Sequence, residues 1–96
     1  MHSDHIKRGL QYEKRKAAEH RAHHIGGPGN PDYQRGKVFG EVKCRQTKVT
    51  KPELQRLVKQ KSVREVDSKA GFTRPAVEYR NTWRSDVKLI QRRRRI

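Results

Sequence analysis

The chain has little cysteine, few apolar residues and no long hydrophobic run. Cys44 is the only cysteine among 96 residues, which excludes a disulfide framework and a cysteine-based zinc cluster. Only 30% of the residues are hydrophobic, and the sequence contains neither a run of about 18 apolar residues nor a signal-peptide core. We therefore expect a cytoplasmic protein, secreted only if it is part of a larger toxin.

Acidic residues are scarce: the chain has 10 Asp and Glu but 25 Lys and Arg, which gives it a formal net charge of +15. The resulting isoelectric point of about 10.8 is typical of a protein that binds a polyanion. Nucleic acid is the obvious polyanion, and an anionic membrane surface or an acidic protein would meet the same requirement. The length predicts one domain over residues 1–96, with a loose start at 1–4 and a basic tail at 91–96.

A glycine-rich run at 25–30 (IGGPGN) predicts a tight loop. The run lacks the Gly-Lys-Ser/Thr ending of a Walker loop, and it is not a dinucleotide-binding fingerprint. Its glycines leave backbone N–H groups accessible, so a phosphate can approach the loop closely.

The stretch after this loop, residues 31–43 (PDYQRGKVFGEVK), predicts a β-hairpin. Gly36-Lys37 is a Gly-X pair of the kind that closes a two-residue type II′ turn. In that register Tyr33 faces Gly40, and Asp32 faces Glu41 with Cβ atoms roughly 5 Å apart. Lys43 shares the strand face of Glu41, and Val38 and Val42 point to the other face.

Two facing carboxylates repel each other unless a cation lies between them. Oxygen ligands without cysteine favour Mg²⁺, with Mn²⁺ as a substitute, and Lys43 is placed to position a water molecule or to stabilise charge on a phosphate. The alternative is a surface hairpin with ordinary alternating charges.

A helix is predicted from about His5 to His24. Glu13 lies within its apolar stripe, where an acid is costly unless it has a partner or a purpose. Glu13 is therefore either a third acid aimed at the metal site or a rim residue paired with a lysine. We assign His20, His23 and His24 to the solvated or phosphate-facing surface.

The second half predicts two helices and two strands. A capping box, 50–53 (TKPE), opens a helix that runs to about Gln60, and 73–75 (TRP) opens another that runs to about Trp83. Strands are predicted at 63–67 and 87–90, followed at 92–95 by an arginine tail that is solvated or binds phosphate and is not a folded feature. The expected fold is a small α/β sandwich with a mixed sheet and flanking helices, in the order α-β-β-α-β-α-β.

The pair Pro31-Asp32, followed by 41–43 (EVK), resembles the signature of the PD-(D/E)xK nuclease superfamily, whose fold is the restriction-endonuclease-like one. Residues 9–13 (GLQYE) with 26–32 (GGPGNPD) are similar to the opening of archaeal Holliday-junction resolvases. Residues 68–73 (SKAGFT), with Pro75-Ala76 and 87–90 (VKLI), resemble the end of Mrr-type restriction endonuclease domains. Together these similarities cover roughly residues 7 to 90.

The resemblance implies a Mg²⁺-dependent endonuclease that hydrolyses DNA. Asp32 and Glu41 would bind the metal with the Val42 carbonyl, Lys43 would organise the attacking water, and Glu13 would match the accessory acid of the first helix. Relatives often act as dimers, which suggests a homodimer. The residues expected to contact nucleic acid are Lys7, Arg8, Gly27, Gly29, Arg35, Arg45, Arg92, Arg93, Arg94 and Arg95.

Two alternatives remain open from the sequence. One is a toxin-type nuclease that cuts RNA or tRNA and is neutralised by an acidic immunity protein. The other is a non-enzymatic basic protein that binds nucleic acid. No base-reading element is evident, so we expect recognition of shape over sequence.

Overall fold

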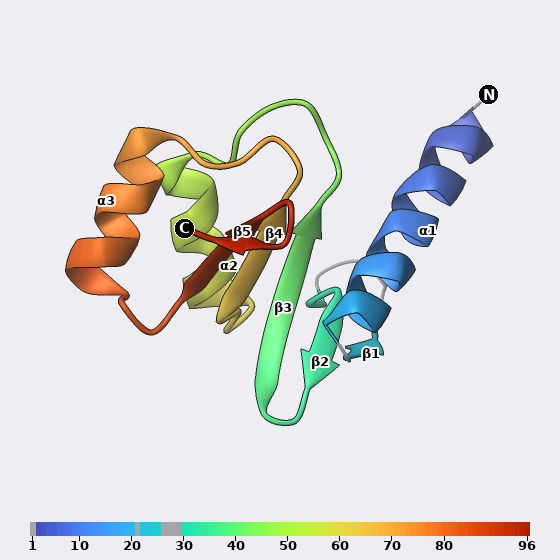
Figure 1. The fold of residues 1–96 in the computed structure, drawn as a ribbon. Helices are drawn as coiled ribbons and strands as arrows, with labels where there is room; N and C mark the ends of the chain where they lie inside the picture. Colours follow the sequence, from blue (N-terminus) through green and yellow to red (C-terminus); the bar gives the residue numbers. More distant parts are fainter. Residues whose placement is uncertain (1, 21, 26–29) are drawn as a thin grey trace.

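The computed structural model describes residues 2–20, 22–25 and 30–96, and for residues 2–10 it describes the backbone only. In these parts the chain forms a small α/β fold with a mixed six-stranded sheet and three helices (Figure 1). No helix there combines the length and apolar character needed to span a bilayer. The elements are α1 (His2–Glu19), β1 (His23–His24), β2 (Tyr33–Arg35), β3 (Val38–Lys43), α2 (Lys51–Gln60), β4 (Glu65–Ser68), α3 (Arg74–Trp83), β5 (Lys88–Gln91) and β6 (Arg94–Arg95).

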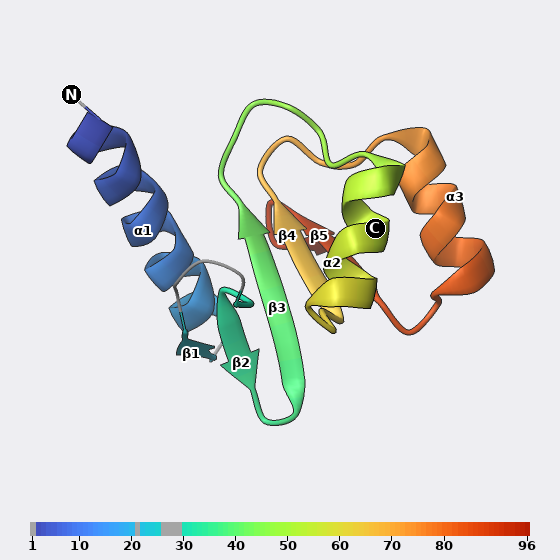
Figure 2. The same cartoon turned by 180° about the vertical axis from the view of Figure 1, so that it is seen from behind.

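The strands lie in the sheet in the same order as in the chain, β1-β2-β3-β4-β5-β6. β3, β4 and β5 are parallel, because α2 and α3 carry the chain back between them, and the other neighbours are antiparallel. Seen from both sides, α2 and α3 pack beside each other on one face of the sheet, and α1 lies away from them beside β1 and β2 (Figures 1 and 2).

The main apolar core lies between the sheet and the α2–α3 pair. It contains Val49, Leu54, Leu57, Val58, Val63, Val66, Phe72, Ala76, Tyr79, Val87 and Leu89. A smaller cluster of Ala17, Tyr33 and Val42 lies under α1. Because successive strand residues point to opposite faces, Val66 joins the main core, while Glu65 and Asp67 face α1.

The hairpin register is confirmed for its three ladder pairs, with Tyr33 opposite Gly40, Gln34 opposite Phe39 and Arg35 opposite Val38. Gly36 adopts a φ of 61°, as the first position of a type II′ turn requires. Gly40 is needed for packing, because a Cβ at this position would overlap the ring of Tyr33.

Both helix starts in the second half are confirmed. Thr73 Oγ1 accepts the N–H of Ala76 at 3.4 Å, which caps α3. Thr50 makes no side-chain cap bond at α2, but Glu53 accepts its backbone N–H, so half of the capping box forms. Tyr79 is the aromatic residue of α3 that packs in the core, while Trp83 is 74% exposed.

The first helix differs from the prediction at both ends. It begins at His2, so residues 2–4 are helical instead of loose, and it ends at Glu19. The residues predicted to form its last turn include strand β1 instead, in which His24 pairs with Tyr33 and His23 with Gln34. This pairing satisfies backbone groups of β2 that would otherwise lie on an open sheet edge.

The arginine tail also differs from the prediction, because it is a folded feature: it forms a hairpin with β5, although its arginines are exposed. Arg92 and Arg93 form the turn with φ of 51° and 65°, and Arg95 pairs with Ile90. Ile96 N–H then donates to the Leu89 carbonyl at 2.8 Å. The return strand thus covers an edge of β5 that would otherwise be unpaired.

Candidate functional site

Asp32 lies just before β2, at the end of the hairpin ladder. Its backbone N–H donates to the Gly40 carbonyl at 2.9 Å, and its Oδ2 accepts the Val42 N–H at 2.7 Å. Burial and the neighbouring charge of Glu41 raise the pKa of Asp32 to about 7, although the Val42 bond and Lys43 act to lower it. The carboxyl is therefore half protonated near neutral pH, a state that a nearby cation would convert to the carboxylate.

Glu41 lies on β3, and only 2% of it is exposed. Its Oε2 atom forms ion pairs with Lys43 at 3.2 Å and with Lys61 at 3.3 Å. Its Oε1 atom is buried and has no hydrogen-bond partner among the residues that the structure describes. Since a buried carboxylate oxygen is costly to leave unpaired, this atom is an available ligand for a cation.

Lys43 lies two residues beyond Glu41 on the same side of β3, as the alternation of the strand predicts. Its Nζ atom lies 3.9 Å from Oε2 of Glu53, in the first turn of α2. Burial acts to raise the pKa of Glu53, but the Arg45 hydrogen bonds and the charge of Lys43 outweigh it, so this pKa is lowered. Two carboxylates thus hold the ammonium group of Lys43 beside the hairpin.

A hollow of about 210 Å³ opens next to these residues. It is lined by Lys43, Glu53, Arg56, Leu57, Gln60 and Lys61. Three of these side chains are cationic, and two of them contact Glu41. The hollow is therefore suited to a phosphate group that lies close to the acids of the hairpin.

These residues fit a Mg²⁺ ion better than a cation that needs a full protein cage. No three His, Cys, Asp or Glu side chains in the described ranges are grouped as metal ligands. Mg²⁺ needs only one or two carboxylates, with water and substrate phosphate completing its shell. The Val42 N–H donates to Asp32. In a strand, the N–H and the carbonyl of one residue point to the same neighbouring strand, so the Val42 carbonyl also faces Asp32.

Glu13 lies on α1. Its Oε2 atom is 3.3 Å from Nε2 of His24, and its charge contributes to the raised pKa of Asp32. It does not form a three-acid group with Asp32 and Glu41. The rim partner expected for Glu13 was a lysine, and the partner found is a histidine.

The residues predicted to contact nucleic acid have different surroundings. Arg35 pairs with the buried Glu65, and Arg45 pairs with Glu53. Arg92, Arg93, Arg94 and Arg95 are exposed, and Arg93 pairs with Glu19. Gly27 and Gly29 lie outside the described residues, as do the side chains of Lys7 and Arg8.

The histidines were predicted to lie on a solvated or phosphate-facing surface, and His20 is not solvated, because most of its side chain is buried. Its Nε2 atom lies 2.8 Å from Oδ2 of Asp67, and its ring stacks on Tyr33 with centroids 5.4 Å apart. Asp67 is fully buried and also lies 3.4 Å from Nζ of Lys16. His24 is likewise engaged, with Glu13, and His23 is exposed.

Sequence reasoning missed Lys61 and the two acids of β4. Lys61 directly follows α2 and pairs with Glu41, which lies 20 positions away in the sequence, so no local pattern marks it. Glu65 accepts a 2.9 Å bond from the Tyr33 hydroxyl. A signal for Glu65 and Asp67 exists, since acids alternate with Val66 in a strand that should be apolar on both faces.

Comparisons with protein-family models, curated proteins and solved structures find no match to this chain. An assignment of function therefore depends on the geometry and charge around Asp32, Glu41 and Lys43. These residues are named here the Asp32–Glu41 site.

Proposed function

We propose that this chain is a metal-dependent endonuclease that hydrolyses phosphodiester bonds of DNA and has a restriction-endonuclease-like fold. The observation that carries the proposal is the pair of acids at one end of the hairpin, the half-buried Asp32 and the buried Glu41. Asp32 has a pKa raised to about 7 partly by Glu41, and Glu41 keeps one oxygen without a partner in the described structure. A perturbed carboxyl beside a second acid and a lysine is typical of a catalytic centre.

Asp32, Glu41 and the Val42 carbonyl would hold Mg²⁺ or Mn²⁺. The bound ion would polarise the phosphate and lower the pKa of a water molecule. Lys43 would orient that water and stabilise the charge that develops on the phosphate, since its ammonium group lies 3.2 Å from Glu41. Lys61 and Arg56 line the adjacent hollow and would bind the phosphate of the strand.

Charge supports a nucleic-acid substrate, because the net charge of +15 favours a polyanion. Much of the affinity would come from phosphate contacts and would fall steeply with salt. The resemblance supports an endonuclease of resolvase-like or restriction-like type. Because no base-reading element is evident in the sequence, cleavage would depend on the shape of the DNA more than on its sequence.

A second candidate is a nucleic-acid-binding protein without catalysis. Lys43 and Lys61 already neutralise Glu41 at 3.2 and 3.3 Å, so the pair of lysines stabilises this buried acid without a metal. In that case the acids of the hairpin would serve stability alone.

A cleavage assay separates these functions. Supercoiled plasmid, a four-way junction and tRNA are incubated with the protein in Mg²⁺ or in EDTA. We expect Mg²⁺-dependent cleavage of DNA, with Asp32→Asn and Lys43→Gln each reducing the rate at least about 100-fold. The exposed residues Glu78 and Lys48 supply matched controls, and Glu78→Gln and Lys48→Gln should leave the rate unchanged.

The other outcomes reject the proposal in distinct ways. Cleavage of tRNA alone would assign the site to RNA, as in a toxin-type nuclease. Binding without metal-dependent cleavage would favour the non-enzymatic protein. Equal rates for the Asp32→Asn variant and its control would reject the Asp32–Glu41 site.

A further inference from the structure

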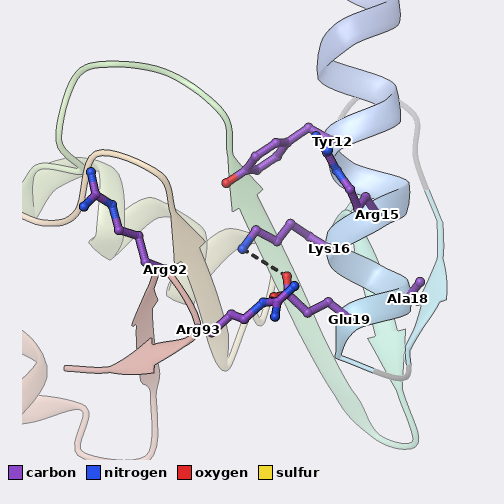
Figure 3. A pocket seen from close by; sticks show the side chains of 7 residues that line it. All are labelled: Tyr12, Arg15, Lys16, Ala18, Glu19, Arg92 and Arg93. Carbon is purple, nitrogen blue, oxygen red and sulfur yellow. Dashed lines mark ion pairs between the residues drawn. The ribbon is translucent and has the colours of Figure 1, made fainter.

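A second basic region lies on the α1 face of the sheet, where two hollows adjoin. The larger, about 680 Å³, lies between α1 and the β5–β6 turn and is lined by Tyr12, Arg15, Lys16, Glu19, Arg92 and Arg93 among others (Figure 3). The smaller, about 190 Å³, is lined mainly by His20, Arg35, Lys88, Arg93 and Arg95. Arg93 lines both hollows, which are therefore neighbours, and the two together are named here the α1–hairpin groove.

The acids along this groove are already paired, which leaves an excess of positive charge. Glu19 pairs with Lys16 at 3.0 Å and with Arg93 (Figure 3). Glu65 accepts hydrogen bonds from Tyr33 and Arg35. Within the described structure, three of the lining cations form no ion pair, and these are Arg15, Arg92 and Arg95.

Two arginines of the groove are held in the turn between β5 and β6. Arg92 and Arg93 both adopt positive φ in the β5–β6 hairpin, a conformation that usually selects Asn or Gly. Holding two arginines in this strained conformation points to a purpose beyond the turn itself. Because the backbone is fixed, a ligand bound there would cost less ordering entropy than one bound to a flexible tail.

The opposite wall is also fixed, by buried acids beneath it. Asp67, fully buried on β4, lies 2.8 Å from Nε2 of His20 and 3.4 Å from Nζ of Lys16. Glu65 lies two residues earlier on the same face of the strand and holds Arg35. These acids offset only part of the charge above them, and their own burial depends on the cations that they hold.

We propose that the α1–hairpin groove binds the phosphodiester backbone of a nucleic-acid strand without a metal ion. Arginine suits this ligand, since its guanidinium group forms paired hydrogen bonds to phosphate oxygens. This proposal rests on the proposed function, because it says where the backbone of the nuclease substrate lies on the protein. Binding there nevertheless requires neither Asp32 nor Mg²⁺, so the two proposals can fail separately.

The test is the binding of a fluorescently labelled DNA strand, measured by anisotropy in EDTA over a range of salt concentrations. The groove variant combines Arg15→Gln, Arg92→Asn and Arg95→Gln, with Asn chosen because it tolerates positive φ. The control variant combines Lys48→Gln, Lys59→Gln and Arg74→Gln, which removes the same charge from exposed positions outside the groove. Circular dichroism melting establishes that both variants are folded.

We expect the groove variant to lose at least about tenfold in affinity and to reduce the salt slope by about two, because each lost phosphate contact contributes about 0.7 to that slope for a single strand. The control variant should lose less than about threefold, and Asp32→Asn should bind like the unmodified protein. Equal losses in the groove and control variants would overturn the proposal. Equally effective competition by polyglutamate would overturn the assignment to nucleic acid.

Cleavage in Mg²⁺ at saturating DNA distinguishes this proposal from the function proposed above. If the groove only binds the substrate, its variant should recover the full rate at high DNA concentration, while Asp32→Asn should not. Intact binding by the groove with no cleavage under any condition would reject the nuclease and leave the groove in place.

Discussion

The side-chain oxygen Oδ2 of Asp32 accepts the backbone N–H of Val42 at 2.7 Å, so a carboxyl group takes a position in the sheet that a backbone carbonyl would otherwise fill. This bond fixes Asp32 against the strand that carries Glu41, and the two acids raise the free energy of the folded chain whenever both are ionised.

The Asp32→Asn substitution should stabilise the protein more at pH 8 than at pH 5. The folded-state pKa of about 7 lies above the unfolded value of 3.8, so the folded chain holds a proton that the unfolded chain releases between these pH values. Stability therefore falls as pH rises toward 7, and the full penalty, at most about 4 kcal/mol, applies above it. Urea unfolding in EDTA at both pH values measures the difference. The same gain at pH 5 and pH 8 would contradict the raised pKa.

Magnesium should stabilise the unmodified protein at pH 8 and have little effect at pH 5.5, where Asp32 is protonated. A concentration 100 times the dissociation constant would add about 2.7 kcal/mol to the free energy of unfolding. Thermal melting with MgCl₂ against NaCl of equal ionic strength measures this effect. Glu78→Gln should keep the stabilisation and Asp32→Asn should lose it. A shift that survives in Asp32→Asn would mean that the ion binds elsewhere.

The Gly40→Ala substitution should destabilise the protein by about 3 kcal/mol, because the new methyl group would overlap the buried ring of Tyr33. A double-mutant cycle with Tyr33→Leu tests the cause. Once the ring is gone, Gly40→Ala should cost at least about 1 kcal/mol less, measured by urea unfolding. Additive effects of the two substitutions would rule out the predicted overlap.

The two threonines that begin α2 and α3 should respond differently to replacement by alanine. Thr73→Ala removes a side-chain bond to the Ala76 N–H and should cost about 1 kcal/mol, whereas the Thr50 side chain makes no cap bond and its replacement should cost less than about 0.5 kcal/mol. Chemical denaturation of both variants provides the comparison. A larger loss for Thr50→Ala would show that its side chain caps α2 after all.

Several features of the fold were predictable from short stretches of sequence. The Gly36-Lys37 pair specified the hairpin register, and with it the proximity of Asp32 to Glu41 and the shared face of Glu41 and Lys43. The Thr-x-Pro patterns specified where α2 and α3 begin. In each case neighbouring residues decide the outcome, because turn conformations and helix caps depend on steric and hydrogen-bonding limits within a few positions.

Other features depend on residues that are distant in the sequence. His20 and Asp67 are 47 positions apart, and Lys61 and Glu41 are 20 apart, yet the side chains of each pair are in polar contact in the folded chain. Helix α1 ends early, at Glu19, because the residues after it pair with the edge of β2. The arginine hairpin forms in the same way, because its return strand pairs with the edge of β5. The sequence by itself therefore determined the local elements and the spacing of the acids. Only the tertiary structure decided which charges are buried together, because burial makes a charged group require a partner and packing determines which partner it finds.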